Sequence, residues 1–185
     1  MRSKTIWKRT AAVLLSAGTF GICSAELAAA SDFVETSGDV LLGAIPAIAF
    51  GSTVYKQDYQ GSWQFAKGFL ANQAVTQGLK YAVHKDRPDD SDDHSFPSGH
   101  TSTTFQAAAF IHKRYGWEYS IPAYIGAAYT GWTRIDSDKH YVEDVLAGAV
   151  IGTLSGLYFA EPYKDARLTP FASTNSLGII LTMQW

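Results

Sequence analysis

The stretch VLAGAVIGTLSGL, residues 145–157, decides the fold class of this 185-residue chain. Its apolar side chains recur at the three- and four-residue spacing of a helix face. Gly148, Gly152 and Gly156 lie four residues apart on one side of that helix, so a second helix can approach its backbone closely. The stretch therefore predicts a helix that packs tightly against another helix.

Other runs without Asp, Glu, Lys or Arg have the same Ala-, Leu- and Gly-rich composition. They cover residues 40–55, 68–79, 95–112 and 119–133. We therefore predict an all-α bundle of five to six helices. Three uncharged runs are 15 or 16 residues long: 40–55, 119–133 and 145–160, the last of which contains the stretch above. This is just below the ~17–25 residues that span a membrane, so the runs indicate either buried core helices or short, tilted membrane helices.

Residues 1–30 have the pattern of an export signal. Four basic side chains in the first nine positions precede an uncharged run over residues 10–25, and Ala28-Ala29-Ala30 offers a cleavage site. Cleavage after Ala25 and an uncleaved first membrane helix are the alternatives. We expect an exported protein, in the periplasm or on the periplasmic side of the inner membrane of a Gram-negative bacterium.

Composition excludes several classes of protein. Without residues 1–30 the chain has 11 basic and 16 acidic residues, a net charge of −5, and no cysteine. This balance argues against nucleic-acid binding, and the single Cys23 excludes a disulfide scaffold or a cysteine-based zinc site. The acidic segment 86–93 lacks the glycine turn and terminal glutamate of an EF-hand, so we interpret it as a solvated loop without a metal.

The end of the chain differs from the rest. Leu177, Ile179, Leu181 and Met183 alternate with other residues, which predicts a strand, paired with residues 170–174 as a short hairpin. The expected organisation is therefore a signal over 1–30, a helical domain over 31–168 and a strand-like tail over 169–185.

Three clusters of polar residues carry the chemistry. They are Lys80 with Arg87-Pro88, then Pro97-Ser98-Gly99-His100, and finally Arg134 with His140 and Asp144. Each alone has an ordinary structural interpretation, as a solvated helix face, a helix N-cap or a surface pair. Together they predict a phosphate site, because guanidinium groups grip phosphate oxygens and N–H groups at a helix start form an anion nest.

Two histidines in such a site can divide a phosphoryl-transfer reaction. Asp144 follows His140 by four residues and can fix its tautomer and stabilise its positive charge, as in a catalytic triad. This predicts His140 as the nucleophile that attacks phosphorus and His100 as the acid that protonates the leaving oxygen.

The spacing of the three clusters resembles the three-part signature of the type 2 phosphatidic acid phosphatase/haloperoxidase superfamily. The resemblance extends from about residue 80 to residue 160, and its one departure is Thr133, where the family usually has serine. It implies a helical bundle and a phosphatase that works without metal or cofactor through a phosphohistidine on His140. It also implies which residues hold the phosphoryl oxygens: Lys80, Arg87, Ser98, Gly99 and Arg134.

The resemblance leaves the substrate open. The small-residue helices and the form of the motifs are more similar to the family's lipid phosphatases, so we expect a phosphomonoester or pyrophosphate of a lipid and association with a membrane. A soluble periplasmic acid phosphatase acting on small phosphomonoesters is the alternative. A vanadate-dependent haloperoxidase is disfavoured because those chains are typically much larger. A non-catalytic binder of anionic lipid would not need His140 or Asp144.

Overall fold

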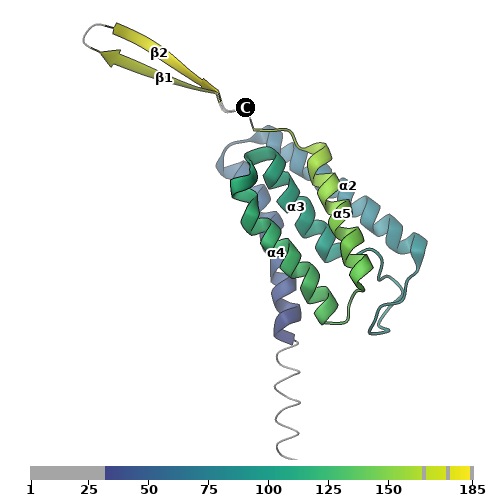
Figure 1. The fold of residues 1–185 in the computed structure, drawn as a ribbon. Helices are drawn as coiled ribbons and strands as arrows, with labels where there is room; N and C mark the ends of the chain where they lie inside the picture. Colours follow the sequence, from purple (N-terminus) through teal and green to yellow (C-terminus); the bar gives the residue numbers. More distant parts are fainter. Residues whose placement is uncertain (1–31, 164–165, 174–175, 184–185) are drawn as a thin grey trace, which may run out of the picture.

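The structure is a computed structural model that describes residues 32–163, 166–173 and 176–183. In these residues it contains five helices (Figure 1): an N-terminal helix, Asp32–Tyr55, then α2, Tyr59–Val83, α3, Gly99–Tyr115, α4, Trp117–Asp136, and α5, Val142–Phe159. The all-α prediction is confirmed, and the described residues contain no sixth helix. The predicted export signal over residues 1–30 lies outside the described residues.

Two strands follow the helices. β1, Ala166–Ser173, pairs antiparallel with β2, Ser176–Met183, so that Ala166 lies opposite Met183 and Ser173 opposite Ser176. The tail boundary predicted at residue 169 therefore falls inside β1.

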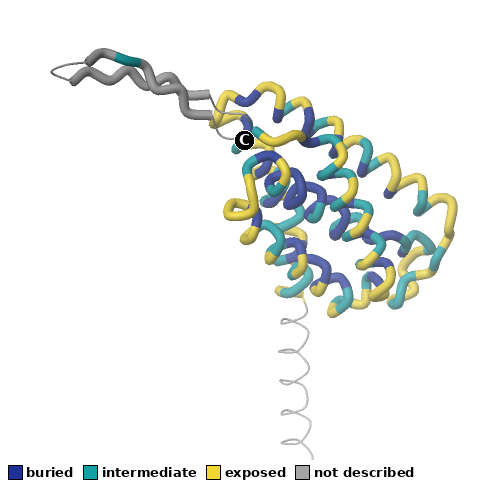
Figure 2. The backbone as a smooth tube through the Cα atoms, turned by 45° about the horizontal axis from the view of Figure 1, so that its top comes forward, coloured by how far each residue is buried: buried dark blue, intermediate teal, exposed yellow. Residues whose placement is uncertain are grey.

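α3 is the central helix of the bundle and packs against α2, α4 and α5. Its buried side chains are mostly small or hydroxyl-bearing, as in the run Ala107-Ala108-Ala109. Figure 2 shows the buried backbone concentrated on the sides of the helices that face one another. Small side chains on the central helix let its neighbours approach closely.

Three glycines of α5 lie directly on the backbone of α3. A Cβ atom at any of them would come within 3.0 Å of a carbonyl oxygen, and the pairs are Gly148 with Ser98, Gly152 with Ser102, and Gly156 with Gln106. Both series advance by four residues in the same direction, so the two helices run parallel. The glycine spacing predicted close packing of this helix against another helix. That prediction is confirmed, and the partner helix is α3.

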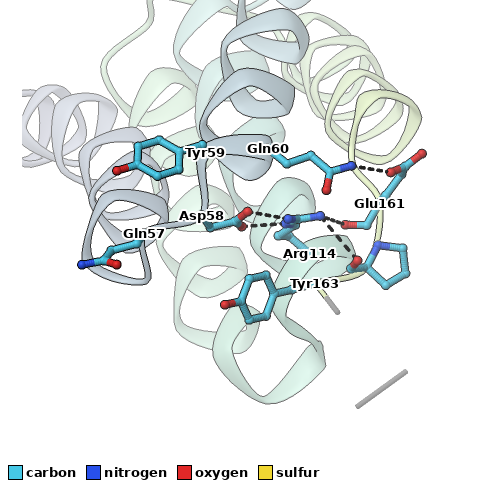
Figure 3. A pocket seen from close by; sticks show the side chains of 8 residues that line it. Gln57, Asp58, Tyr59, Gln60, Arg114, Glu161 and Tyr163 are labelled. Atoms are coloured by element: carbon cyan, nitrogen blue, oxygen red, sulfur yellow. Dashed lines mark hydrogen bonds and ion pairs between the residues drawn. The ribbon is translucent and has the colours of Figure 1, made fainter. Parts of the chain in front are cut away.

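The end of the bundle where α3 and α5 finish is fastened by a buried ion pair (Figure 3). Asp58 caps α2 through the Gly61 N–H and accepts hydrogen bonds from Arg114 of α3, with 2.7 Å between Nε and Oδ2. Arg114 also donates to the carbonyl oxygen of Glu161, just after α5, at 2.9 Å. A pocket of about 480 Å³ opens beside this pair. Because its arginine and aspartate bind each other and backbone groups, we interpret the cluster as a structural fastening of three segments.

The outer surface of the bundle carries many large apolar side chains. On α5 they form a stripe with four-residue spacing, opposite the glycines and each more than half exposed: Val142, Leu146, Val150, Leu154 and Tyr158. The interior holds buried polar side chains, among them Asn72, Thr76 and Gln106, beside an apolar core that includes Ile45, Phe65 and Phe110. The N-terminal helix and α5 are also long and apolar enough to cross a membrane.

The contact between α3 and α5 can be tested with a single methyl group. We expect Gly152→Ala to lower the free energy of unfolding by about 1–3 kcal/mol, because its Cβ would overlap the Ser102 carbonyl oxygen. Gly43→Ala in the N-terminal helix is the matched control, since no atom lies within 4 Å of its Cβ position. An alanine there should be neutral or stabilise by about 0.5–1 kcal/mol. Thermal unfolding followed by circular dichroism measures both, and equal stability of the two variants would contradict the packing described.

Candidate active site

The three predicted clusters meet at the end of the bundle where α3 and α5 begin. A pocket of about 360 Å³ lies there, and the predicted residues that line it are Arg87, His100, Arg134 and His140. Its other lining residues are Glu35, Asp39, Ser91, Asp92 and Lys139. The pocket lining does not include the remaining predicted residues, which are Lys80, Ser98, Gly99 and Asp144.

The start of α3 is tied to the first turn of α5. Ser98 is the N-cap of α3: its Oγ accepts a hydrogen bond from Thr101 Oγ1 at 3.0 Å, and its N–H donates to the Asp144 carbonyl oxygen at 2.9 Å. The N–H groups of Gly99 and His100 belong to the first turn, where a helix supplies no acceptor of its own. This is the geometry of an anion-binding helix end.

His140 lies in the loop between α4 and α5 and is almost fully buried. His140 and Asp144 are four residues apart but do not lie on one helix, because α5 begins only at Val142. His140 Nδ1 is 3.9 Å from Asp144 Oδ2, and Ser95 bridges them. The Ser95 hydroxyl donates to Asp144 at 2.5 Å and lies 3.4 Å from His140 Nδ1.

Asp144 is completely enclosed by donors. Besides Ser95, it accepts hydrogen bonds from the Tyr141 N–H at 3.0 Å and from Lys85 Nζ at 2.7 Å. Lys85 also binds Glu143, so it links the loop after α2 to the first turn of α5. Sequence reasoning missed Ser95 and Lys85. Their closeness in sequence to Phe96-Pro97-Ser98 and to Arg87 was the only available signal.

The surroundings of His140 keep its imidazole neutral. Burial and the positive charges of Lys80 and Arg87 lower its pKa to about 3, and the opposing effect of Asp144 is smaller. A neutral imidazole has a free lone pair on one ring nitrogen. Because Nδ1 faces Ser95 and Asp144, we infer that the lone pair for chemistry is on Nε2.

Arg134, at the end of α4, is buried and held from three sides. Its guanidinium donates to Asp39 Oδ1 at 3.0 Å, to the Glu35 carbonyl oxygen at 2.6 Å and to Thr133 Oγ1 at 3.2 Å. The hydroxyl of Thr133, the one departure from the family pattern, therefore positions the arginine. A group held in this way is ready to meet an anion without losing further conformational entropy.

His100 shares the carboxylate that binds Arg134. Its Nε2 lies 2.9 Å from Asp39 Oδ1, so one carboxylate of the N-terminal helix orients both an arginine and a histidine of the pocket. Sequence reasoning missed Asp39 because about 40 residues separate it from Lys80, where the nearest motif begins, and nothing in its own run marks it.

Lys80 lies near the end of α2, and Arg87 lies in the loop that follows. Arg87 donates through Nε to Asp92 Oδ1 at 2.7 Å and contacts the Lys139 carbonyl oxygen at 3.4 Å. Lys80 Nζ donates to the His94 carbonyl oxygen at 2.5 Å, and the side chain of Lys80 lies next to Gly99. Contacts with the loop thus set the positions of both cations.

Comparison with known proteins identifies the family of this chain. The model of the PAP2 superfamily matches residues 61–166. A lipid A 4'-phosphatase from Helicobacter pylori is 31% identical over 82% of this chain and 85% of its own length. A lipid A 1-phosphatase from Porphyromonas gingivalis is 43% identical over 49% of this chain, which is 21% of that protein.

Two crystal structures share the fold. LpxE from Aquifex aeolicus aligns with a TM-score of 0.52 over 65% of this chain and 84% of its own, at 20% identity. A transmembrane PAP2-type phosphatidylglycerolphosphate phosphatase from Bacillus subtilis aligns with a TM-score of 0.56 over 85% of this chain and 86% of its own, at 22% identity. With the motifs, the family match and a relative aligned over most of its length in agreement, this chain belongs to the PAP2 superfamily.

Proposed function

We propose that this chain is an exported membrane phosphatase that removes phosphate from a lipid headgroup through a phosphohistidine on His140, with no metal in the reaction. The observation that carries the proposal is the pocket itself. A buried neutral His140 shares one 360 Å³ pocket with a second histidine and two guanidinium groups. The named activities of the two bacterial relatives, lipid A 4'-phosphatase and lipid A 1-phosphatase, support the substrate class.

In the first step, the Nε2 lone pair of His140 attacks phosphorus and the bond from phosphorus to the ester oxygen breaks. His100 gives its proton to that departing oxygen, so the alcohol leaves neutral. The positive charge that develops on the His140 ring is stabilised by Asp144, with Ser95 between them. Arg87, Arg134, Lys80 and the N–H groups at the start of α3 bind the phosphoryl oxygens as charge shifts onto them.

In the second step, water attacks the phosphohistidine. His100, now neutral, accepts a proton from that water while the bond from phosphorus to His140 Nε2 breaks, and inorganic phosphate leaves. Asp39 orients the His100 ring through both steps, because its carboxylate is hydrogen-bonded to His100 Nε2 and is itself held by the Arg134 guanidinium. Asp39 is therefore a positioning residue of the proposed mechanism.

The surface of the bundle supports a membrane location. Exposed aliphatic side chains run along the outer surface, as the stripe on α5 shows, and large aromatic side chains lie exposed at both ends. The exposed aromatic residues at the end with the ion pair include Tyr55, Tyr59, Trp63, Trp117, Tyr119 and Tyr158, and those at the pocket end include Phe33, Tyr81, Trp132 and Tyr141. Aromatic belts of this kind mark the two interfaces of a bilayer. They favour the lipid phosphatase over the soluble acid phosphatase.

The orientation follows from the export signal. If residues 1–30 are cleaved, or stay as a first membrane helix with their basic end in the cytoplasm, residue 32 emerges on the periplasmic side. The N-terminal helix starts at the pocket end, because Glu35 and Asp39 line the pocket. The pocket then opens at the periplasmic face.

The role of His140 is tested by His140→Asn, which removes the nucleophile and keeps a small polar side chain. We expect kcat to fall by about 10⁴-fold or more, while inorganic phosphate still binds, because the arginines remain. His112→Asn is the matched control, since this ring packs against Trp117 at the other end of α3. Persistent hydrolysis by His140→Asn, with the control fully active, would refute the phosphohistidine mechanism.

The substrate class is tested with the purified full-length chain in mixed detergent micelles. We expect kcat/KM for lipid A or another phosphorylated lipid to exceed that for p-nitrophenyl phosphate by at least about 100-fold, because the lipid adds contacts at the membrane face. Fractionation without detergent should leave the protein with the membranes. Equal turnover of both substrates by a detergent-free soluble fraction would instead establish the acid phosphatase alternative.

The pH dependence follows from the pKa of His140. With a pKa of about 3, the imidazole stays neutral well below pH 6.5, so loss of the nucleophile by protonation occurs only in strong acid. In Lys80→Gln one of the charges that lower this pKa is removed, so the pKa must rise. A histidine NMR titration of the substrate-free enzyme measures it directly. A pKa near 6.5 in the wild type, or no upward shift in Lys80→Gln, contradicts the electrostatics described.

A further inference from the structure

A cluster of metal-ligating side chains lies outside the proposed phosphatase pocket, where α2 ends. His84 Nδ1 is 2.9 Å from Asp93 Oδ2, and His94 Nδ1 is 2.8 Å from Asp93 Oδ1. One ligand atom from each residue falls within 4.8 Å of the other two. We propose that His84, Asp93 and His94 bind a Zn²⁺ ion that holds the loop of residues 84–95 in place.

The donor set selects the type of metal. Two imidazole nitrogens and one carboxylate oxygen suit Zn²⁺ and similar transition-metal ions, whereas Ca²⁺ and Mg²⁺ take oxygen ligands. The three side chains are partly to largely exposed, so water can reach the ion and complete its tetrahedral coordination. Both rings already direct Nδ1 at the shared carboxylate. Metal binding therefore needs only the tautomer with the proton on Nε2 and a small separation of the three groups.

The backbone and the neighbouring side chains hold the ligands close before any ion binds. His84 ends α2 in the left-handed conformation, with φ of 46°, which turns the chain into the loop. The His94 ring packs edge-on against Tyr81 with 5.3 Å between ring centroids. The Lys80 ammonium fixes the His94 carbonyl oxygen. A preorganised ligand set loses less entropy on binding a metal than a flexible one.

The position of the cluster indicates what the ion would do. The ion would join the end of α2 to the last residues of the loop, where a single backbone bridge already links Lys85 and His94. Between and beside these ligands the loop presents Arg87 to the pocket and Ser95 to Asp144. The ion would thus stabilise the geometry of the phosphate-side cations and touch neither substrate nor His140. It is a supporting site, distinct from the metal-free reaction proposed above.

Direct binding is the test, because it does not depend on phosphatase activity. The full-length chain, free of any histidine tag and purified in detergent, is titrated with Zn²⁺ by isothermal calorimetry in a phosphate-free buffer. Binding of Co²⁺, followed through its visible absorption bands, reports tetrahedral coordination. We expect one site per chain that excess Ca²⁺ does not displace, and a higher midpoint of thermal unfolding in the presence of Zn²⁺.

Variants locate the site. His84→Ala/His94→Ala should abolish this binding and the thermal shift, and Asp93→Asn should weaken binding by about tenfold or more. His112→Ala, which removes a histidine elsewhere, should bind like the wild type. All three leave His100 and His140 intact, so loss of binding cannot be assigned to the pocket.

Two results would overturn the inference. One is a wild type that binds no Zn²⁺ in the micromolar range, in which case the three side chains form a hydrogen-bonded network only. The other is a double variant that binds Zn²⁺ as tightly as the wild type. Either result leaves the proposed phosphatase activity untouched, and an inactive protein that still binds Zn²⁺ at this cluster would reject the activity alone.

Discussion

The direct backbone contact between α3 and α5 is the constraint on which the rest of the structure depends. Glycines at every fourth position of α5 let it lie against the carbonyl oxygens of α3 over two helical turns. Because the two helices run parallel, their first turns lie side by side. This is what allows the Ser98 N–H to bind the Asp144 carbonyl oxygen and brings the anion-binding end of one helix to the carboxylate of the other.

From that contact the electrostatics of the pocket follow. Asp144 is buried where the helices meet, and it is tolerated there because Ser95, Lys85 and the Tyr141 N–H satisfy its oxygens. His140 lies beside it, is largely buried and is close to two cations, so its imidazole is kept neutral. The proposed nucleophile, the carboxylate beside it and the proposed phosphate-binding groups are therefore arranged by packing before any substrate arrives, which is how a site avoids reorganisation during reaction.

The same packing explains the distribution of polar and apolar side chains. Helices that meet through glycine, alanine and hydroxyl groups leave many of their large apolar side chains on the outer surface. In water such a surface would be costly, whereas in a bilayer it is matched by the lipid chains. The net charge of −2 and intermediate hydropathy of the whole chain hide this division, because they average a basic N-terminal segment, an apolar outer surface and an interior that holds many polar groups.

The sequence by itself determined the all-α class, the glycine-mediated helix contact and the family, because helical spacing and the three motifs are local in the chain. Only the tertiary structure decided that Asp39 orients both His100 and Arg134, and that Ser95 and Lys85 enclose Asp144. It also showed that Ser95 bridges His140 to Asp144. These positions depend on segments far apart in sequence that meet at one end of the bundle, and no local spacing records such a meeting.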